Sequence, residues 1–214
     1  MTMASRIMHA NNFKQVQRNY DRLSNFYDVL SGKAELLIQR KAVAKLKERK
    51  IKKLLDIGCG TGRFLVEVRK SAKQVILPVG IDLSFGMCRK ASRQKNSIAC
   101  ANGHTLPFNA AVFDAVTFNF SLEIFPEDCI TPLLGECARV LGPDGFICVV
   151  SMAKAPGRNV MSSLYLWAHL QFPAVIDCQP ISAVQLLGEN GFKIIENETC
   201  RLWGLPVDIA LAKK

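Results

Sequence analysis

The sequence predicts an α/β fold in which a mostly parallel sheet carries helices on both faces and ends in an antiparallel hairpin. From residue 53 onward, short apolar runs typical of buried strands alternate with longer stretches of helical apolar spacing, and this alternation indicates a parallel sheet. Near the carboxyl terminus, two strand-like runs are separated only by residues around 202–205. Such a short connection suits a hairpin and cannot hold a crossover helix.

The expected elements follow in a regular order. Strands are expected at 53–57, 75–82, 97–101, 113–120 and 145–151. Helices are expected at 61–72, 84–94, 127–141, 159–171 and 180–190. Ahead of the first strand, helical spacing predicts two flanking or lid helices at 12–30 and 33–50, separated at Ser31-Gly32. A length of 214 residues with 49% hydrophobic content favours one globular domain.

Composition argues against several classes of protein. The eight cysteines form no Cys-x-x-Cys pair and no signal-like segment opens the sequence, so neither a disulfide framework nor secretion is indicated and a reducing cytoplasm is expected. The apolar stretch 160–178 is interrupted by Gln171 and Pro173, which favours a buried or interfacial helix over a membrane span. No cluster of His, Cys and carboxylate residues has the spacing of metal ligands, so no metal is expected.

The positive charge is concentrated near the amino terminus. The formal net charge is +10, and residues 1–53 hold 13 Lys and Arg against 4 Asp and Glu, which leaves 15 against 14 for the rest. Seven cations crowd the end of the second predicted helix, namely Lys41, Lys45, Lys47, Arg49, Lys50, Lys52 and Lys53. They could contact an anionic membrane, nucleic acid or an acidic substrate, or form a solvated face whose cations suit a helix C-terminus.

A glycine-rich stretch, "LLDIGCGTGRF", places Gly58, Gly60 and Gly62 directly after a strand-like run. Such a turn before a helix lets backbone N–H groups approach an anionic or polar ligand, at the sheet edge where open α/β folds bind ligands. An arginine stands where the Gly-x-Gly-x-x-Gly dinucleotide pattern needs its third glycine, and no Gly-x-x-x-x-Gly-Lys phosphate loop occurs. Twenty residues later Asp82 ends the next apolar run, and its carboxylate could accept from both hydroxyls of a ribose.

At these residues the sequence resembles the class I S-adenosylmethionine-dependent methyltransferases. Four segments in the family's order carry the likeness, most similar to the ubiquinone/menaquinone biosynthesis branch: "LLDIGCGTGRF", "VGIDLSFGMCRKA", "LPFNAAVFDAVTFNFSLEIF" and "ECARVLGPDGFICVVS". The resemblance covers residues 20–192 and is weakest over 155–180. It implies a Rossmann-like methyltransferase fold with a mostly parallel seven-stranded sheet, a C-terminal antiparallel hairpin and N-terminal lid helices, and it implies S-adenosyl-L-methionine as cofactor.

The resemblance also divides the chain and assigns the cofactor site. One methyltransferase domain is expected, with basic N-terminal helices (1–50), a cofactor-binding core (51–152), a substrate lid region (153–190) and the terminal hairpin (191–214). The residues implied to bind the cofactor are Asp56, Gly58, Cys59, Gly60, Gly62, Asp82, Leu83, Met87, Asn102, Gly103 and Asn119. Phe118 and Ser121 are implied to line its reactive side.

Within that set the roles differ. The glycine-rich stretch would hold the methionine end of the cofactor, Asp82 the ribose, and Leu83 and Met87 the two faces of the adenine. Asn102 stands where the family usually has an aspartate, and its amide oxygen can still accept from the adenine amino group. Each residue also has a structural interpretation: the glycines could only shape a turn, Asp82 could only cap a helix, and Cys59 could only be a small core residue.

Few acid or base residues are expected in the reaction, because a methyl group on a sulfonium is already electrophilic and the enzyme mainly positions a nucleophile. A base is needed only when the acceptor loses a proton, as a hydroquinone would. The candidates are Glu123, Tyr20, Tyr27, His104 and His169. Histidines such as these two are more often surface or core residues than catalysts.

The acceptor is expected to be a small molecule. The segment "NFSL" at 119–122 lacks the Asn-Pro-Pro-Tyr pattern of nucleic-acid methyltransferases, which disfavours nucleic acid. The apolar segment 159–176 lies where related enzymes build substrate lids, and a prenylated quinol, C-methylated at its ring, would suit it. Alternatives are N-methylation of a phospholipid head group, methylation of another small molecule at nitrogen or oxygen, and a non-catalytic cofactor-binding assembly protein. The ending "WGLPVDIALAKK" departs from the quinone branch.

Two further possibilities stay open from the residues alone. An NAD-dependent oxidoreductase is disfavoured because no Tyr-x-x-x-Lys pair occurs. The basic N-terminal helix and the apolar segment could together hold the enzyme peripherally on an anionic membrane. The oligomeric state is not predicted.

Overall fold

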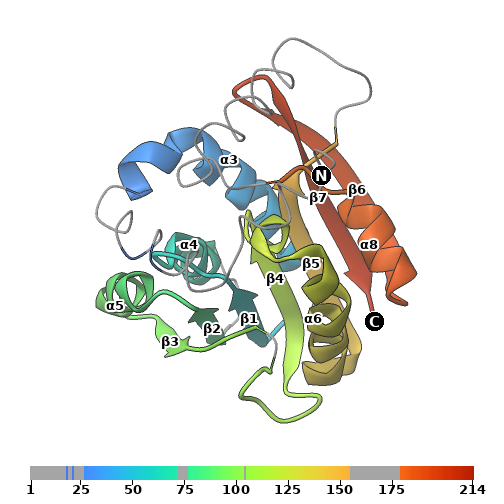
Figure 1. Ribbon diagram of the computed structural model, residues 1–214. Helices are drawn as coiled ribbons and strands as arrows, with labels where there is room; N and C mark the ends of the chain where they lie inside the picture. The colour runs from blue at the N-terminus through green and yellow to red at the C-terminus, as the bar shows by residue number, and fades with distance from the viewer. Residues whose placement is uncertain (1–17, 19–20, 22–26, 72–76, 104, 155–178) are drawn as a thin grey trace, which may run out of the picture.

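The computed structural model describes residues 18, 21, 27–71, 77–103, 105–154 and 179–214. Seven strands form one sheet in the order β3-β2-β1-β4-β5-β7-β6, and helices cover both of its faces (Figure 1). Strands β1 to β5 run parallel to one another, whereas β7 is antiparallel to both β5 and β6. The predicted fold class is confirmed, including the antiparallel hairpin at the end.

The strands lie close to their predicted positions. They are β1 (Lys53–Ile57), β2 (Leu77–Asp82), β3 (Ser97–Cys100), β4 (Phe113–Asn119), β5 (Leu141–Met152), β6 (Lys193–Leu202) and β7 (Leu205–Lys213). Ile57 at the end of β1 pairs with Ile81 of β2 and with Phe118 of β4. The carboxyl ends of the three central strands therefore meet at one edge of the sheet, where the glycine-rich stretch begins.

Two layers of helices bury the two faces of the sheet. The helices are α3 (Tyr27–Lys47), α4 (Arg63–Ser71), α5 (Phe85–Arg93), α6 (Glu127–Val140) and α8 (Ala183–Glu189), with a short 3-10 turn η1 (Leu122–Ile124). Apolar residues of α3 and α4 pack in one buried cluster with Leu54 of β1, and those of α6 and α8 pack in another with Leu55. Because successive side chains of a strand point to opposite faces, neighbouring residues of β1 enter different layers.

The prediction of two N-terminal helices separated at Ser31-Gly32 is wrong over the described residues, because α3 continues through both positions. A glycine inside a helix costs only about 1 kcal/mol relative to alanine. Further along α3, Ile38, Ala42 and Leu46 are almost fully buried against the sheet, and this packing stabilises the helix beyond the local cost. The predicted helix at 159–171 lies outside the described residues.

Strand β5 begins earlier than predicted, at Leu141 rather than at residue 145. Leu141 pairs with Phe113, but the next pair joins Phe146 to Ala115, so the intervening residues form a bulge. Pro143 has no N–H to donate to a ladder, which explains why pairing is interrupted there. The stretch Leu-Gly-Pro-Asp-Gly at 141–145 thus contains a bulge inside the strand.

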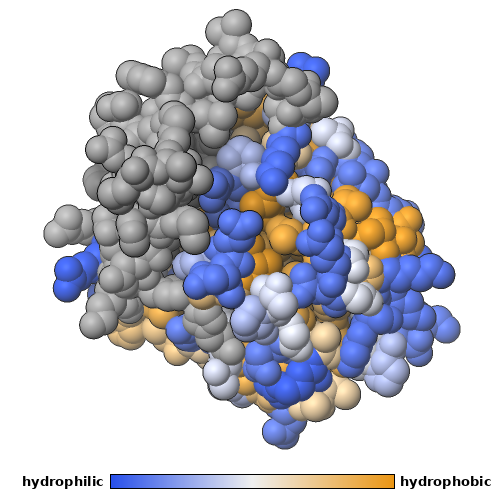
Figure 2. All heavy atoms as spheres, turned by 45° about the vertical axis from the view of Figure 1, so that its right-hand side comes forward, coloured by the Kyte–Doolittle hydropathy of each residue, from blue (hydrophilic) through white to orange (hydrophobic). Residues whose placement is uncertain are grey.

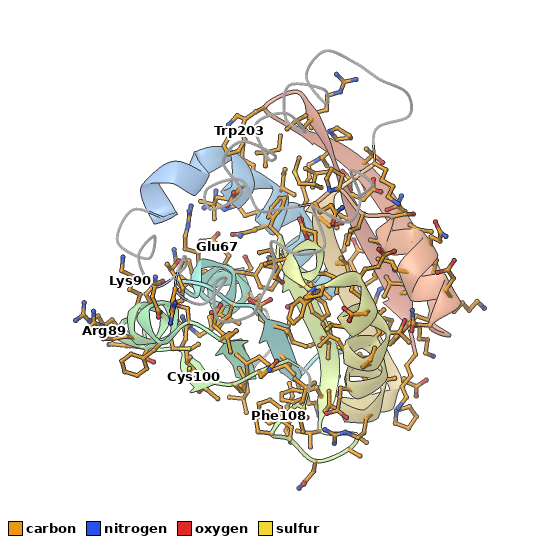
Figure 3. All side chains as sticks on the ribbon, viewed as in Figure 1. Glu67, Arg89, Lys90, Cys100, Phe108 and Trp203 are labelled. Atoms are coloured by element: carbon orange, nitrogen blue, oxygen red, sulfur yellow. The ribbon has the colours of Figure 1, made fainter. Side chains whose placement is uncertain are left out.

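The hairpin closes through a two-residue turn. Leu202 pairs with Leu205, and the two residues between them, Trp203 and Gly204, both have positive φ, at 51° and 82°. This conformation is that of a type I′ turn, whose twist matches the twist of the flanking strands. Trp203 lies at this turn in Figure 3 and is 58% exposed.

The face formed around α6, α8 and β6 comes forward in Figure 2, where hydrophilic residues are interspersed with smaller apolar areas. Within the described ranges, no helix combines the length and the apolar character needed to cross a bilayer.

Candidate cofactor-binding site

A cleft opens at the carboxyl edge of β1, β2 and β4. It encloses about 740 Å³ of empty space, part of it open to solvent. This main cleft is lined by Ile57, Gly58, Gly60, Ile81, Asp82, Leu83, Ala101, Asn102, Gly103, Asn119, Phe120, Ser121, Ile124 and Phe125. Seven of the residues implied by the sequence to bind the cofactor are in this lining: Gly58, Gly60, Asp82, Leu83, Asn102, Gly103 and Asn119.

The three glycines of the loop have positive φ, but they are needed for different reasons. A Cβ on Gly58 would lie 2.6 Å from the Cβ of Ser121, and a Cβ on Gly62 would lie 3.0 Å from the Cβ of Ala91. A Cβ on Gly60 would have no heavy atom within 4 Å. Gly60 is therefore the glycine that faces open space, whereas Gly58 and Gly62 permit close packing against other parts of the protein.

Gly62 lies outside the lining of the main cleft, so this packing accounts for the glycine and its contact with the cofactor stays a prediction. Its neighbour Asn96 donates a hydrogen bond to the Gly62 carbonyl at 3.2 Å and to the Ala91 carbonyl at 3.1 Å. The third glycine thus lets the loop pack against the C-terminal turn of α5. Sequence spacing could not distinguish this role from ligand contact.

Asp82 connects the glycine-rich loop to the end of β2. Its Oδ2 accepts the backbone N–H of Gly60 at 2.8 Å, and its Oδ1 accepts the N–H of Ser84 at 2.8 Å. Burial raises the pKa of Asp82, and these two hydrogen bonds partly oppose the rise. A carboxylate has about four acceptor positions, so Asp82 at the cleft wall can accept a ribose hydroxyl in addition to backbone N–H groups.

The helix that follows Asp82 is capped by other residues. Ser84 is the N-cap of α5 and its Oγ accepts the N–H of Met87 at 3.1 Å. The Asp21 carboxylate accepts from the Ser84 hydroxyl at 2.5 Å and from the Gly86 N–H at 2.9 Å. The structural interpretation of Asp82 as a mere cap is therefore incomplete, since Ser84 and Asp21 carry out that function. Nothing in the sequence pattern indicated Asp21.

Polar side chains gather on the face of the sheet that α3 and α4 cover. Thr117 donates to Asp56 Oδ1 at 2.7 Å, and Asn119 Nδ2 donates to the same oxygen at 2.9 Å. Asp56 is 1% exposed, and its other oxygen has no hydrogen-bond partner among the described residues. Thr117 was not predicted, although alternate residues of β4 share a face and Asn119 was predicted.

Burial dominates the electrostatics of Asp56. It raises the pKa of the carboxyl to about 7, against the hydrogen bonds from Thr117 and Asn119, which lower it. A nearby positive charge would favour the ionised form and bring the pKa down again. The site is therefore suited to a cationic group beside Asp56.

A second, smaller hollow adjoins the main cleft on the side of α3. This side hollow is lined by Glu35, Gln39, Asp56, Gly58, Cys59, Gly60, Thr61, Arg63, Phe64 and Asn119. Asp56 and Cys59, predicted to bind the cofactor, thus lie here and not in the main cleft. Cys59 is 7% exposed, and burial raises the pKa of its thiol well above the usual range.

The adenine side of the site differs from the prediction at one residue. Leu83 lines the main cleft, but Met87 is completely buried and is not in the lining. One helical turn beyond the cap, Met87 packs in the core, so a contact between Met87 and the adenine stays a prediction. The Phe125 ring also lines the cleft and would lie 3.1 Å from a Cβ on Gly103, which explains the glycine there.

The candidate bases are not assembled in the described part of the cleft. Glu123 is 1% exposed, and its Oε1 accepts the N–H of Met152 at 3.1 Å, which links η1 to the end of β5. It lines neither hollow, so its role as a base stays a prediction. Tyr20, His104 and His169 lie outside the described residues, and only the backbone of Tyr27 is described.

Three of the seven clustered cations form ion pairs with glutamates of β6. Lys45 of α3 lies 3.2 Å from Glu196 and 3.0 Å from Glu198 of β6, Lys41 lies 2.8 Å from Glu198, and Arg49 lies 2.5 Å from Glu196. These cations hold α3 against the edge of the sheet. Lys47, Lys50, Lys52 and Lys53 are exposed.

Comparison with known proteins places this geometry among methyltransferases. A family model described as a methyltransferase domain matches residues 55–149. The demethylmenaquinone methyltransferase of Corynebacterium kroppenstedtii is 32% identical over 181 residues, which are 81% of this chain and 76% of that protein. The demethylmenaquinone methyltransferase of Staphylococcus aureus is 28% identical over 158 residues, 72% of this chain and 63% of that protein. The match thus spans less than two thirds of the Staphylococcus protein.

Solved structures support the fold at lower identity. A 1,6-didemethyltoxoflavin-N1-methyltransferase of Burkholderia thailandensis, solved with 1,6-didemethyltoxoflavin and S-adenosylhomocysteine bound, has a TM-score of 0.66 at 19% identity, covering 94% of this chain and 88% of that one. An S-adenosylmethionine-dependent methyltransferase of Thermotoga maritima has a TM-score of 0.72 at 19% identity, covering 92% and 99%. At this identity the likeness shows the shared fold alone.

Proposed function

Because the chain belongs to the class I S-adenosylmethionine-dependent methyltransferases, on the branch of the demethylmenaquinone methyltransferases, we propose that it methylates a ring carbon of a prenylated quinol. The observation that carries the proposal is the 32% identity to the Corynebacterium demethylmenaquinone methyltransferase. The apolar walls of the main cleft support it, since Phe120, Ile124 and Phe125 lie beside the polar cofactor residues.

The described residues fit S-adenosylmethionine. Asp82 would accept from the ribose hydroxyls, and the partnerless oxygen of Asp56 would accept from the amino group of the methionine end. Leu83 and Asn102 would contact the adenine from one end of the cleft. Arg63 in the side hollow offers a positive charge suited to the methionine carboxylate.

S-adenosylmethionine supplies a methyl group whose carbon is electrophilic because it is bonded to a positively charged sulfur. The protein would orient the acceptor and exclude water, because aligned reactants in a site without water need little further catalytic assistance. Phe120 has a φ of +55°, an uncommon conformation for a residue with a side chain, and its N–H is fixed by the Val150 carbonyl at 2.8 Å. This conformation turns the chain at the end of β4 and orients an aromatic wall of the cleft.

The main cleft has few described residues that could act as an acid or a base. Among its described lining residues, only Asp82 carries a carboxylate, and it is occupied with the loop and the proposed ribose. A chain-supplied base for a quinol hydroxyl would therefore come from Tyr20, Tyr27, His104 or His169, which stay predictions. Their individual replacement by Phe or Gln should reduce the rate without weakening cofactor binding.

The proposal is tested with the full chain, methyl-labelled S-adenosylmethionine and detergent-dispersed demethylmenaquinone, chemically reduced to the quinol. We expect label in a product 14 mass units heavier, from the quinol and not from the oxidised quinone. Asp82→Ala serves as the inactive control. Label entering phospholipid instead would support the head-group alternative and contradict the quinol. Cofactor binding without any transfer to quinol or lipid extract would support a non-catalytic role.

We also propose that the protein contacts an anionic membrane peripherally, where prenylated quinols reside. The exposed Lys47, Lys50, Lys52 and Lys53 support this, whereas Lys41, Lys45 and Arg49 are already engaged with glutamates. Each exposed lysine near an anionic surface contributes about 1 kcal/mol. Sedimentation with anionic vesicles that is lost at high salt, and lost in a variant with the four lysines replaced by Gln, is expected. Failure to sediment at low salt would contradict the proposal.

A further inference from the structure

Three residues that line the side hollow each carry a buried acceptor oxygen without a donor. Gln39 of α3 contributes Oε1, Asp56 contributes Oδ2 and Asn119 contributes Oδ1. All three atoms are buried, and within the described part of the chain none has a hydrogen-bond partner. Two of them come from the central strands, but Gln39 comes from a helix that lies outside residues 55–149, the segment matched by the methyltransferase family model.

This arrangement is costly unless a ligand completes it. A buried polar atom left unpaired costs about 1–3 kcal/mol, and native proteins hold few of them. Here three residues that line one hollow each carry such an atom, and one of them is a carboxylate that is 1% exposed. A protonated primary amine has three N–H donors, no acceptor and a positive charge. It therefore matches the number, the polarity and the charge of these three oxygens.

Resting on the proposed function, we infer that Gln39 is a specificity-determining residue for the cofactor, accepting a hydrogen bond from its protonated amino group beside Asp56 and Asn119. The helix α3 is then a wall of the cofactor site and not only a cover for the sheet. Recognition of the amine would then depend on a residue outside the four segments that carry the family resemblance.

The placement of Gln39 is fixed by its neighbours on the helix. Ile38 is 4% exposed in the core beneath α3. Arg40, on the other side, donates to Glu67 of α4 at 2.7 Å, and Figure 3 shows Glu67 on the side of α4 that faces α3. The pairing of Lys45 with β6 anchors the following turn. The helix backbone at Gln39 is therefore held in position before any ligand binds, which lowers the entropy cost of binding.

The experiment compares three thioadenosine ligands by calorimetry on the full chain at pH 8. S-adenosylhomocysteine carries the amine and the carboxylate, 5′-(3-aminopropylthio)-5′-deoxyadenosine carries the amine alone, and 5′-methylthioadenosine carries neither. Gln39→Met keeps the length of the side chain and removes the acceptor. We expect this substitution to lower the affinity for the first two ligands about tenfold, as for the loss of a hydrogen bond to a charged group. The affinity for methylthioadenosine should not change.

Two matched variants complete the test. Gln39→Glu keeps the acceptor and should restore the affinity of both amine ligands to within threefold of the wild type. Lys47→Met, on the exposed side of the same helix, should change none of the three affinities. Because Gln39→Met removes an unpaired buried oxygen, the melting temperature of the ligand-free protein should not fall.

The outcomes are separable. Equal weakening of all three ligands by Gln39→Met, or a fall in melting temperature, would mean a structural role and overturn the inference. If the substitution lowers the affinity for S-adenosylhomocysteine but not for the aminopropyl ligand, Gln39 contacts the carboxylate rather than the amine. This result would also overturn the inference. If the wild type binds none of the three, the proposed function itself fails.

Discussion

The Asp82 carboxylate accepts the backbone N–H of Gly60 at 2.8 Å, which joins the end of β2 to the glycine-rich loop that follows β1. The two residues are 22 positions apart in the sequence and line the same cleft. This hydrogen bond fixes the one loop glycine that faces open space. The carboxylate proposed to bind the ribose is thus also the residue that holds the loop in shape.

Asp82→Ala should therefore reduce the affinity for S-adenosylhomocysteine and for methylthioadenosine alike, because both carry the ribose. A loss well beyond tenfold, which is about 1.4 kcal/mol, is expected for each ligand. Calorimetry measures the affinities. Ser84→Ala is the matched control: loss of the N-cap should lower stability by about 1 kcal/mol with little change in affinity. Unchanged affinity in Asp82→Ala would place the ribose elsewhere.

Alanine at Gly60 and at Gly62 should have opposite consequences. At Gly60 a Cβ meets nothing within 4 Å, so the fold should lose only the roughly 1–2 kcal/mol of a left-handed backbone while the ligand affinity falls at least tenfold. At Gly62 the Cβ would press on Ala91 and Asn96, and a larger fall in melting temperature is expected. Equal effects of the two substitutions on affinity and on melting would contradict these roles.

The stability of the ligand-free protein should depend on Asp56. Its pKa is about 7 in the folded state against an ordinary value of 3.8, so between these pH values the folded protein holds a proton that the unfolded chain has released. Stability from this group therefore falls as pH rises from about 4 to 7, by at most about 4 kcal/mol. Asp56→Asn should melt higher than the wild type at pH 8 and equally near pH 4.

The same carboxyl should couple cofactor binding to pH. Because the cationic amino group favours ionised Asp56, the affinity for S-adenosylhomocysteine should rise with pH up to about 7 and then level off, with proton release on binding near pH 7. Calorimetry in two buffers of different ionisation enthalpy measures the released proton. An affinity that is flat from pH 5.5 to 8 in the wild type would rule out this coupling. Glu127→Gln, at an exposed site, is the control.

Leu83 and Met87 should separate binding from packing. Leu83→Ala shortens a wall of the cleft and should weaken adenosine-containing ligands several-fold, with a small change in stability. Met87 is completely buried, so Met87→Ala should lower the free energy of unfolding by about 2–5 kcal/mol without a direct loss of affinity at temperatures where it is folded. A loss of affinity in Met87→Ala without a loss of stability would instead support a contact between Met87 and the adenine.

The pairing of α3 with β6 should stabilise the protein modestly and in a salt-dependent way. Hydrogen bonds from Lys41 and Lys45 lower the pKa of Glu198 to about 2, so its contribution is fully present above its ordinary value of 4.5 and is lost as pH falls from there toward 2. Glu198→Gln should cost up to about 1 kcal/mol at pH 7 and low salt, and less at high salt. Chemical denaturation measures both values, and no difference at low salt would show that the pair is neutral.

The sequence alone determined the fold class, the approximate positions of the strands and the identity of most cleft residues. Periodic apolar runs and the glycine-rich stretch depend on local chain geometry, so they can be interpreted without a structure. Asp82, Leu83, Asn102 and Gly103 were placed correctly at the main cleft because each follows directly after the end of a strand, where the backbone itself brings it to the ligand-binding edge.

Only the tertiary structure decided which residues complete the site. Gly62 and Met87 have the spacing of ligand contacts but turn toward neighbouring elements, and Glu123 is used to link two chain segments. Gln39 lies in a helix outside the four motif segments, yet packing brings it into the lining of the same side hollow as Asp56. Contacts between segments distant in sequence depend on side-chain packing and burial, and these have no periodic signature in the chain.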